Sequence, residues 1–310
     1  MPDIPLTAGR KIARYTLDSR EELRQYTPMD TIRYQLKTLN RQFQIASKNR
    51  TACSNNLTAL MEQSYPGVRS LFSSPVRSDG SQKWVDFAQT FWHVDCVAKL
   101  SLNAFAVKYQ KWCKRHGYNF SGPKAAEIHD HAWTLFLLVP KSDTTKLLVR
   151  EAITQLNTIS HTAEVFRAEM NRLAAQLPEY ETVMAVTGVG PQLMAEIGDV
   201  RRFAQKSSLV AFAGIDPGRN DSGSKESSKG RIVKRGSPHL RKTLFLIMSI
   251  LLQLKPEDDP VYQFLDKKRS EGKPFYIYMT AGGTKFLPIY YGKVRDCLKE
   301  KGLWDEPLMD

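Results

Sequence analysis

Cysteines are few in this chain and their spacing excludes two classes of protein. The four cysteines, Cys53, Cys96, Cys113 and Cys297, include no CxxC pair. Their separations match neither a zinc ribbon nor the disulfide framework of a small secreted domain. We therefore expect reduced thiols in a cytosolic protein.

Long apolar runs are also missing. No stretch approaches 18 uninterrupted apolar residues, and the first residues, MPDIPLTAGRK, lack the apolar core of a secretion signal. The most apolar run, LFLIMSILLQL (Leu244–Leu254), is too short to span a bilayer and follows a basic segment. These features predict no membrane partner and a buried core helix over this run.

Acidic residues are scarce relative to basic ones. The 310 residues include 45 Lys and Arg against 32 Asp and Glu, which gives a net charge of +13. Such an excess favours a polyanionic partner, most often nucleic acid, and the alternative is a basic protein without one. Apolar residues at 42% suffice for a sizeable core, in one large domain or two to three small ones.

Two segments carry apolar residues at alternating spacings of three and four. The first has one charged interruption and ends at SYPG, and the second ends at Pro178. This period predicts two long helices that form a coiled-coil arm, with each other or with a second subunit, and ordinary bundle helices are the alternative. The two stripes are Ile32, Leu36, Leu39, Phe43, Ala46, Arg50, Cys53, Leu57, Leu60, and Val149, Ala152, Leu156, Ile159, Ala163, Phe166, Met170, Leu173, Leu177.

Between the stripes, Lys83–His116 is predicted as a helix rich in aromatic residues that ends at Gly117, and another helix follows Pro123. Aromatic residues at helical spacing are more often core than platforms for bases. His129 and His131 are two residues apart, so on a helix they point to different faces. We therefore predict no metal site there.

The segment YETVMAVTGVGPQLMAEIG (Tyr180–Gly198) has the pattern of a helix-hairpin-helix. Gly188 and Gly190 allow a tight turn, and Pro191 suits the first position of the next helix. The backbone N–H groups of such a turn can bind a phosphate without recognising bases. A plain helical hairpin is the alternative.

The basic segment Gly214–Lys242 follows soon after, with eight Lys and Arg against three acids and many Gly and Ser residues. It could be a solvated connector, a phosphate clamp or a loop that holds a nucleophilic serine. Its length inside a compact domain is typical of functional loops. The predicted phosphate contacts are Arg219, Lys229, Arg231, Lys234, Arg235 and Arg241.

These motifs carry a family resemblance. VTGVGPQLMAEIGDVRRFAQKSSLVAFAGIDP, then NDSG, then GRIVKRGSPHLRK and the apolar helix resemble the C-terminal domain of IS110-type insertion-sequence transposases, a group that includes the pilin-gene DNA invertases. KPFYIYMTAGGTKFLPIYYGKVRDCL (Lys273–Leu298) is similar as well. The resemblance covers about residues 10–300, and its signature lies in 183–242.

The resemblance implies a bacterial, nucleoid-associated DNA recombinase guided by a structured RNA. It implies an N-terminal RuvC-like domain whose four acidic residues hold Mg²⁺. It also implies a C-terminal serine, matched by Ser222 in NDSG, that attacks DNA phosphate. The D-x-x-D step that precedes I-A-x-Y in the family is absent before Ile12-Ala13-Arg14-Tyr15. We therefore expect a truncated member in which this chain binds no metal.

The expected organisation is mainly α-helical. It comprises a remnant of the RuvC-like domain at 1–30, a helical coiled-coil region at 31–178, and a C-terminal domain with the helix-hairpin-helix at 179–310. The expected function is DNA transposition or recombination by strand transfer through the Ser222 nucleophile. Because the metal-binding acids are absent, we expect this chain alone to be inactive in cleavage. Alternatives are a DNA- or RNA-binding remnant without catalysis and a structural helical protein. Heptad helices favour a homo-oligomer.

Overall fold

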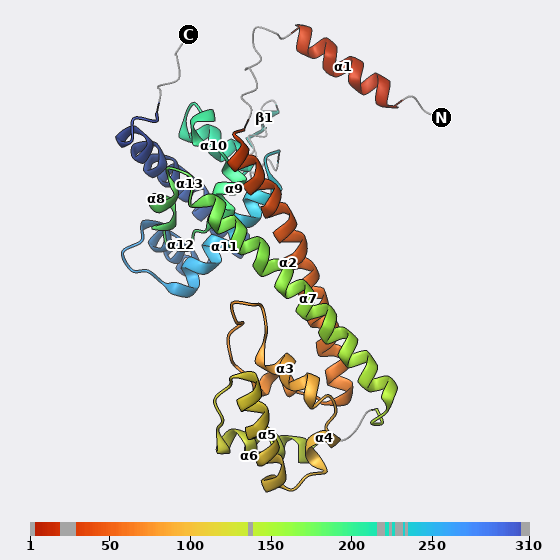
Figure 1. Cartoon of the computed structure of the whole chain (residues 1–310). Helices are drawn as coiled ribbons and strands as arrows, with labels where there is room; N and C mark the ends of the chain where they lie inside the picture. Colours follow the sequence, from red (N-terminus) through yellow and green to blue (C-terminus); the bar gives the residue numbers. More distant parts are fainter. Residues whose placement is uncertain are drawn as a thin grey trace. The chain divides into compact units, whose positions relative to one another are not determined.

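The computed structural model describes residues 4–18, 29–135, 139–215, 221–222, 225–226, 232 and 235–304. The fold is mainly α, as predicted (Figure 1). Contacts divide the chain into two units. We call residues 35–196 the helical unit, and residues 1–34 together with 197–310 the C-terminal unit. The division after residue 196 falls inside the segment predicted as a helix-hairpin-helix.

The elements follow one another as helices with a single short strand pair. In the first part of the chain they are α1 (Ile4–Asp18), α2 (Thr31–Ser64), η1 (Val68–Leu71), α3 (Lys83–Thr90), α4 (Asp95–Ala98), α5 (Leu102–His116), α6 (Gly122–Trp133) and α7 (Asp143–Ala174). In the second part they are α8 (Tyr180–Met184), α9 (Pro191–Ile197), η2 (Val200–Arg202), α10 (Lys206–Ala213), β1 (Asp221–Ser222), β2 (Lys225–Glu226), α11 (Pro238–Leu254), α12 (Pro260–Ser270) and α13 (Phe275–Glu300).

The first heptad stripe lies on α2 and the second on α7, the two longest helices of the structure, except for Leu177, which follows the end of α7 at Ala174. Every residue of both stripes is buried or half-buried, and Leu36, Leu57 and Ala163 are fully buried. The helices run side by side in the helical unit (Figure 1). Arg50, the charged interruption of the first stripe, donates from Nη1 to Glu164 Oε1 of α7 at 3.2 Å. The supercoil and a pairing with a second subunit stay predictions.

The region between the long helices is a helical subdomain with an aromatic core. The predicted aromatic residues of this region, Trp84, Phe87, Phe91, Trp92, Phe105, Tyr109 and Trp112, are all buried. The prediction of core rather than base platforms is therefore confirmed. Gly117 ends α5 in the left-handed conformation with φ 66°, and Gly122 and Pro123 open α6, as expected.

The prediction of one helix over Lys83–His116 was wrong, because the segment forms α3, α4 and α5. Phe91 leaves the helical conformation with φ −114° and ψ 58°. The chain then buries Phe91 and His93, whose Nε2 lies 3.1 Å from Val139 O. Ser101 starts α5 by accepting a hydrogen bond from Ala104 N. Tertiary burial here outweighs the continuous helical pattern.

The C-terminal unit is built on α13, which contacts α10, α11 and α12. Gly282 lets α11 and α12 approach α13 closely, because a Cβ there would lie 2.8 Å from Met248 Sδ and would also overlap the Leu265 side chain. Leu244–Leu254 lies within α11 and buries one face in this core, as predicted, while Leu246 on the other face is 47% exposed.

The structure also describes the cysteines and the apolar helices. All four cysteines are free thiols. Within the parts of the chain that the structure describes, no helix combines the length and the apolar character needed to cross a membrane.

Candidate nucleic-acid interface

Within the basic segment, Gly214 and Gly236 meet between α10 and α11 at a point that we call the neck. Gly214 ends α10 in the left-handed conformation with φ 65°. A Cβ on Gly236 would overlap Phe212 O and the Gly214 nitrogen, so the two backbones touch. Only glycine allows this approach at both positions.

Hydrogen bonds close the neck. Ser237 N donates to Phe212 O at 2.8 Å. Arg241 Nη1 donates to Ala213 O at 3.0 Å and to Gly236 O at 3.2 Å. The Arg241 guanidinium therefore joins the end of α10 to the residues just before α11. The two ends of the segment between Gly214 and Gly236 therefore lie close together.

The candidate nucleophile lies in a short strand pair within this segment. Ser222 belongs to β1, and its Cα partner across the antiparallel pair is Lys225 of β2. Asp221 is paired with Glu226 in the same way. The backbone hydrogen bonds of the pair give Ser222 a regular conformation where the sequence pattern predicts only loop. This strand pair is the local structure that positions the proposed site.

The structure places some of the predicted phosphate contacts and not others. Arg235 is exposed at the neck. Arg241 is half-buried and donates to the two carbonyls described above, a role that the charge of the segment did not predict. A guanidinium has five N–H donors, so Arg241 retains donors for a phosphate. Its phosphate contact stays a prediction. Arg219, Lys229, Arg231 and Lys234 lie outside the described residues.

The neck itself was not recognised from the sequence. Ser237 caps α11 by accepting from Leu240 N at 3.2 Å, and Pro238 occupies the start of the helix. This Ser-Pro pair is a helix-start signal. Two local signals accompany the neck in the sequence. Gly236-Ser237-Pro238 precedes the apolar helix α11, and Gly214 ends the preceding helix α10.

The segment predicted as a helix-hairpin-helix contains two short helices, α8 in the helical unit and α9, whose last residue Ile197 falls in the C-terminal unit. Gly188 has φ +77°, the left-handed value that the tight turn requires. Helix α9 begins at Pro191, as predicted, and Ala195 is completely buried. Gly188 and Gly190 are half-exposed. The turn is therefore accessible, and its contact with phosphate stays a prediction.

A buried carboxylate fixes α9 against α2. Glu196 is fully buried and accepts from Asn40 Nδ2 at 2.5 Å and from Arg41 Nη2 at 2.9 Å. Burial raises the pKa of Glu196 above its usual value of 4.5, against the opposing effects of Arg41 and Asn40. The folded state therefore binds a proton at Glu196 more tightly than the unfolded state does.

We expect Glu196→Gln to change how stability depends on pH. Because the folded pKa is raised, the stabilisation from protonated Glu196 is fully present below 4.5 and is lost as pH rises through the folded pKa. The free energy of unfolding of the wild type, minus that of Glu196→Gln, should therefore fall as the pH rises above 4.5 and through the raised pKa of the folded state. Urea unfolding at each pH measures it, and a constant difference would contradict the assignment.

The residues that the structure describes do not fit the Mg²⁺ site that the family implies. Among them, no group of three or more His, Cys, Asp or Glu side chains is placed to hold a metal ion. His129 and His131 contact different carbonyls, Leu100 O and Pro66 O, each at 2.8 Å. Asp259, the last of three consecutive acidic residues, caps α12 by accepting from Val261 N and Tyr262 N. We derive no catalytic step through a metal.

Part of the chain matches a known protein family. Residues 180–263 match the family described as "Transposase IS116/IS110/IS902 family". The match includes α8, α9, α10, the neck, β1 and β2, and α11. No curated protein matches the chain.

Proposed function

We propose, from the match of residues 180–263 to the IS116/IS110/IS902 transposase family, that the chain binds DNA phosphates through its basic segment and joins Ser222 to DNA during transposition. The observation that carries the proposal is the neck. It fixes both ends of the segment that holds Ser222 and most of the predicted cations. A serine nucleophile needs such positioning, because its hydroxyl must lie in line with the phosphorus it attacks.

The proposed step is a transesterification. Ser222 Oγ forms a bond to phosphorus, and the bond from phosphorus to one bridging oxygen of the DNA breaks. The departing oxygen keeps the electron pair and takes a proton, while the serine proton goes to a base. One phosphate ester replaces another, so no oxidant, reductant or nucleotide is consumed. The Arg and Lys side chains around the segment would stabilise the charge on the phosphate oxygens.

Arg235 offers the cleanest test of phosphate binding, because it is exposed and lies at the neck. We expect Arg235→Ala to weaken duplex binding by a similar factor, about threefold to tenfold, on unrelated sequences. Fluorescence anisotropy with two labelled duplexes of different sequence measures this change. A phosphate contact carries no base information, so the two losses should agree.

Arg269→Ala is the matched control, since Arg269 is an exposed arginine at the end of α12 in the same unit. It should leave duplex affinity within about twofold of the wild type. Equal losses in both variants would show that general surface charge, and not the neck, holds the DNA. A loss confined to one duplex would show base recognition in place of phosphate binding.

The binding-only alternative predicts no chemistry from the purified chain. Incubation of the chain with supercoiled plasmid and Mg²⁺ separates the two proposals: nicking excludes a protein that only binds. A guide RNA and assembly through the long helices are also part of our proposal. They are tested by RNA co-purification and by light scattering of the purified chain.

A further inference from the structure

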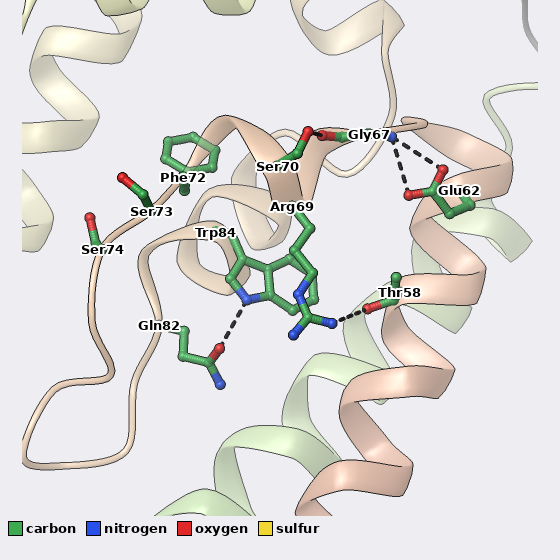
Figure 2. A pocket seen from close by; sticks show the side chains of 10 residues that line it. All are labelled: Thr58, Glu62, Gly67, Arg69, Ser70, Phe72, Ser73, Ser74, Gln82 and Trp84. Atoms are coloured by element: carbon green, nitrogen blue, oxygen red, sulfur yellow. Dashed lines mark hydrogen bonds between the residues drawn. The ribbon is translucent and has the colours of Figure 1, made fainter. Parts of the chain in front are cut away.

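An open hollow of about 570 Å³ lies in the helical unit, and its lining includes none of the residues discussed above as DNA contacts. It is formed by the end of α2, by η1, and by the loop that leads into α3 (Figure 2). Its lining combines one guanidinium, two aromatic rings, and several hydroxyl and amide groups. These residues are Thr58, Glu62, Gly67, Arg69, Ser70, Phe72, Ser73, Ser74, Gln82 and Trp84. A volume of this size is typical of small-ligand sites.

Arg69 is held in place inside this hollow although it is exposed. Its guanidinium carbon lies 5.4 Å from the centre of the Trp84 ring, and its Nη1 donates to Thr58 Oγ1 at 3.1 Å. Trp84 is fixed in turn by Nε1, which donates to Gln82 Oε1 at 3.0 Å. Figure 2 shows the guanidinium between the Trp84 ring and Thr58. The bond to Thr58 uses one of five N–H donors, so the ordered group can bind an anion at little entropic cost.

The loop that forms one wall is anchored at its far end. Gly80 has φ +86°, and a Cβ there would lie 2.9 Å from the carbonyl carbon of Ser160 in α7. Arg77 N donates to Ser81 O at 3.0 Å, which closes the turn around Gly80. The serines of the wall, Ser73 and Ser74, therefore belong to a loop with fixed ends.

Further cations continue from the hollow along exposed or half-buried aromatic rings. Lys83 Nζ lies 5.9 Å from the centre of the Phe72 ring and 5.1 Å from that of Tyr118. Arg77 lies 4.0 Å above the same Tyr118 ring and donates to His116 O at 2.9 Å. A row of ordered cations with rings between them is the arrangement by which proteins hold an unpaired nucleic-acid strand.

We propose that this hollow is a binding site for one nucleotide of a single-stranded nucleic acid. Arg69 and the serine hydroxyls bind the phosphate, the base packs against Phe72, and Lys83 and Arg77 bind the following phosphates. Glu62 opposes binding from one wall, where its two oxygens accept from Gly67 N at 3.2 Å. The inference rests on the proposed role of the chain in handling nucleic acid, and it adds a site to the one proposed on the basic segment.

The test measures anisotropy of labelled 12-nucleotide oligo(dT) and oligo(U) with the full chain. Arg69→Gln should weaken binding of the strand about fivefold to tenfold. Arg150→Gln, which changes an exposed arginine of α7 outside the hollow, should leave it within about twofold. Glu62→Gln should strengthen binding about twofold to fivefold, because it removes the one negative charge of the lining. Thermal melting confirms that each variant is folded.

The outcomes separate this site from the proposed function. If the wild type binds neither strand nor duplex, the proposed function fails. If it binds both, and Arg69→Gln and Glu62→Gln bind the strand like the wild type, only this site is wrong. A loss in Arg69→Gln with duplex affinity unchanged supports the site. The ratio of oligo(U) to oligo(dT) affinity then shows whether the strand is RNA or DNA. If free thymidine monophosphate displaced the labelled strand as effectively as unlabelled oligo(dT) does, the hollow would be a mononucleotide site. That result would overturn the proposal of a strand.

Discussion

Ser222→Ala should abolish the covalent link between the chain and DNA while leaving duplex affinity within about twofold of the wild type. Removing one hydroxyl removes the attacking atom and no positive charge, so the phosphate contacts persist. The substrate is a labelled duplex taken from the flank of the coding sequence of the chain. Denaturing electrophoresis detects the adduct, and mass spectrometry of the nucleotide-bearing peptide locates the attachment.

Ser224→Ala is the control for this prediction, because Ser224 is two residues further along the same segment. Its adduct should form at the wild-type level. An adduct that persists in Ser222→Ala would show that another group attacks the phosphate. If the wild type forms no adduct in Mg²⁺, the catalytic part of the proposal fails and DNA binding alone remains.

Gly236→Ala should have the largest effect on the structure around the site. A Cβ at this position would overlap Phe212 O, the Gly214 nitrogen and the Ala213 carbonyl carbon, and backbone atoms cannot move aside as a flexible side chain does. We expect the free energy of unfolding to fall by about 2–3 kcal/mol. The adduct should also be lost in the folded fraction, because the opened neck no longer positions Ser222. Urea unfolding and the adduct assay measure the two effects.

Gly292→Ala separates the neck from glycine replacement in general. Gly292 lies within α13 of the same unit, and a Cβ there would meet no atom within 4 Å. Helix propensity predicts a gain in stability of about 0.5–1 kcal/mol for this change. A Gly236→Ala protein as stable as the wild type, with a normal adduct, would show that the neck is not needed.

Local signals account for the parts of the fold that the sequence predicted. The two apolar stripes repeat at a helical period, and their residues are buried along α2 and α7. Gly117 ends a helix in the left-handed conformation, and α9 begins at Pro191. Each of these signals lies within a few residues of the structure it determines.

Contacts between distant residues account for what the sequence did not predict. The sequence did not explain the charged residue Arg50 in the first stripe. Its ion-pair partner, Glu164, lies far away in the chain and becomes its neighbour only in the folded structure. The aromatic segment of Lys83–His116 breaks because Phe91 is buried in the core of the subdomain. Arg241 was assigned to phosphate from its charge, yet the carbonyls it binds become neighbours only when Gly214 and Gly236 touch. Periodicity and composition carry no information on such pairings.

Duplex binding at increasing salt tests the central proposal, that this chain holds DNA by its phosphates, most directly. The logarithm of the association constant should fall linearly with the logarithm of salt concentration, with a slope of about −0.9 for each phosphate contacted. The slope should become shallower by about one contact in Arg235→Ala. A flat response, or no binding by the wild type at low salt, would contradict the proposal.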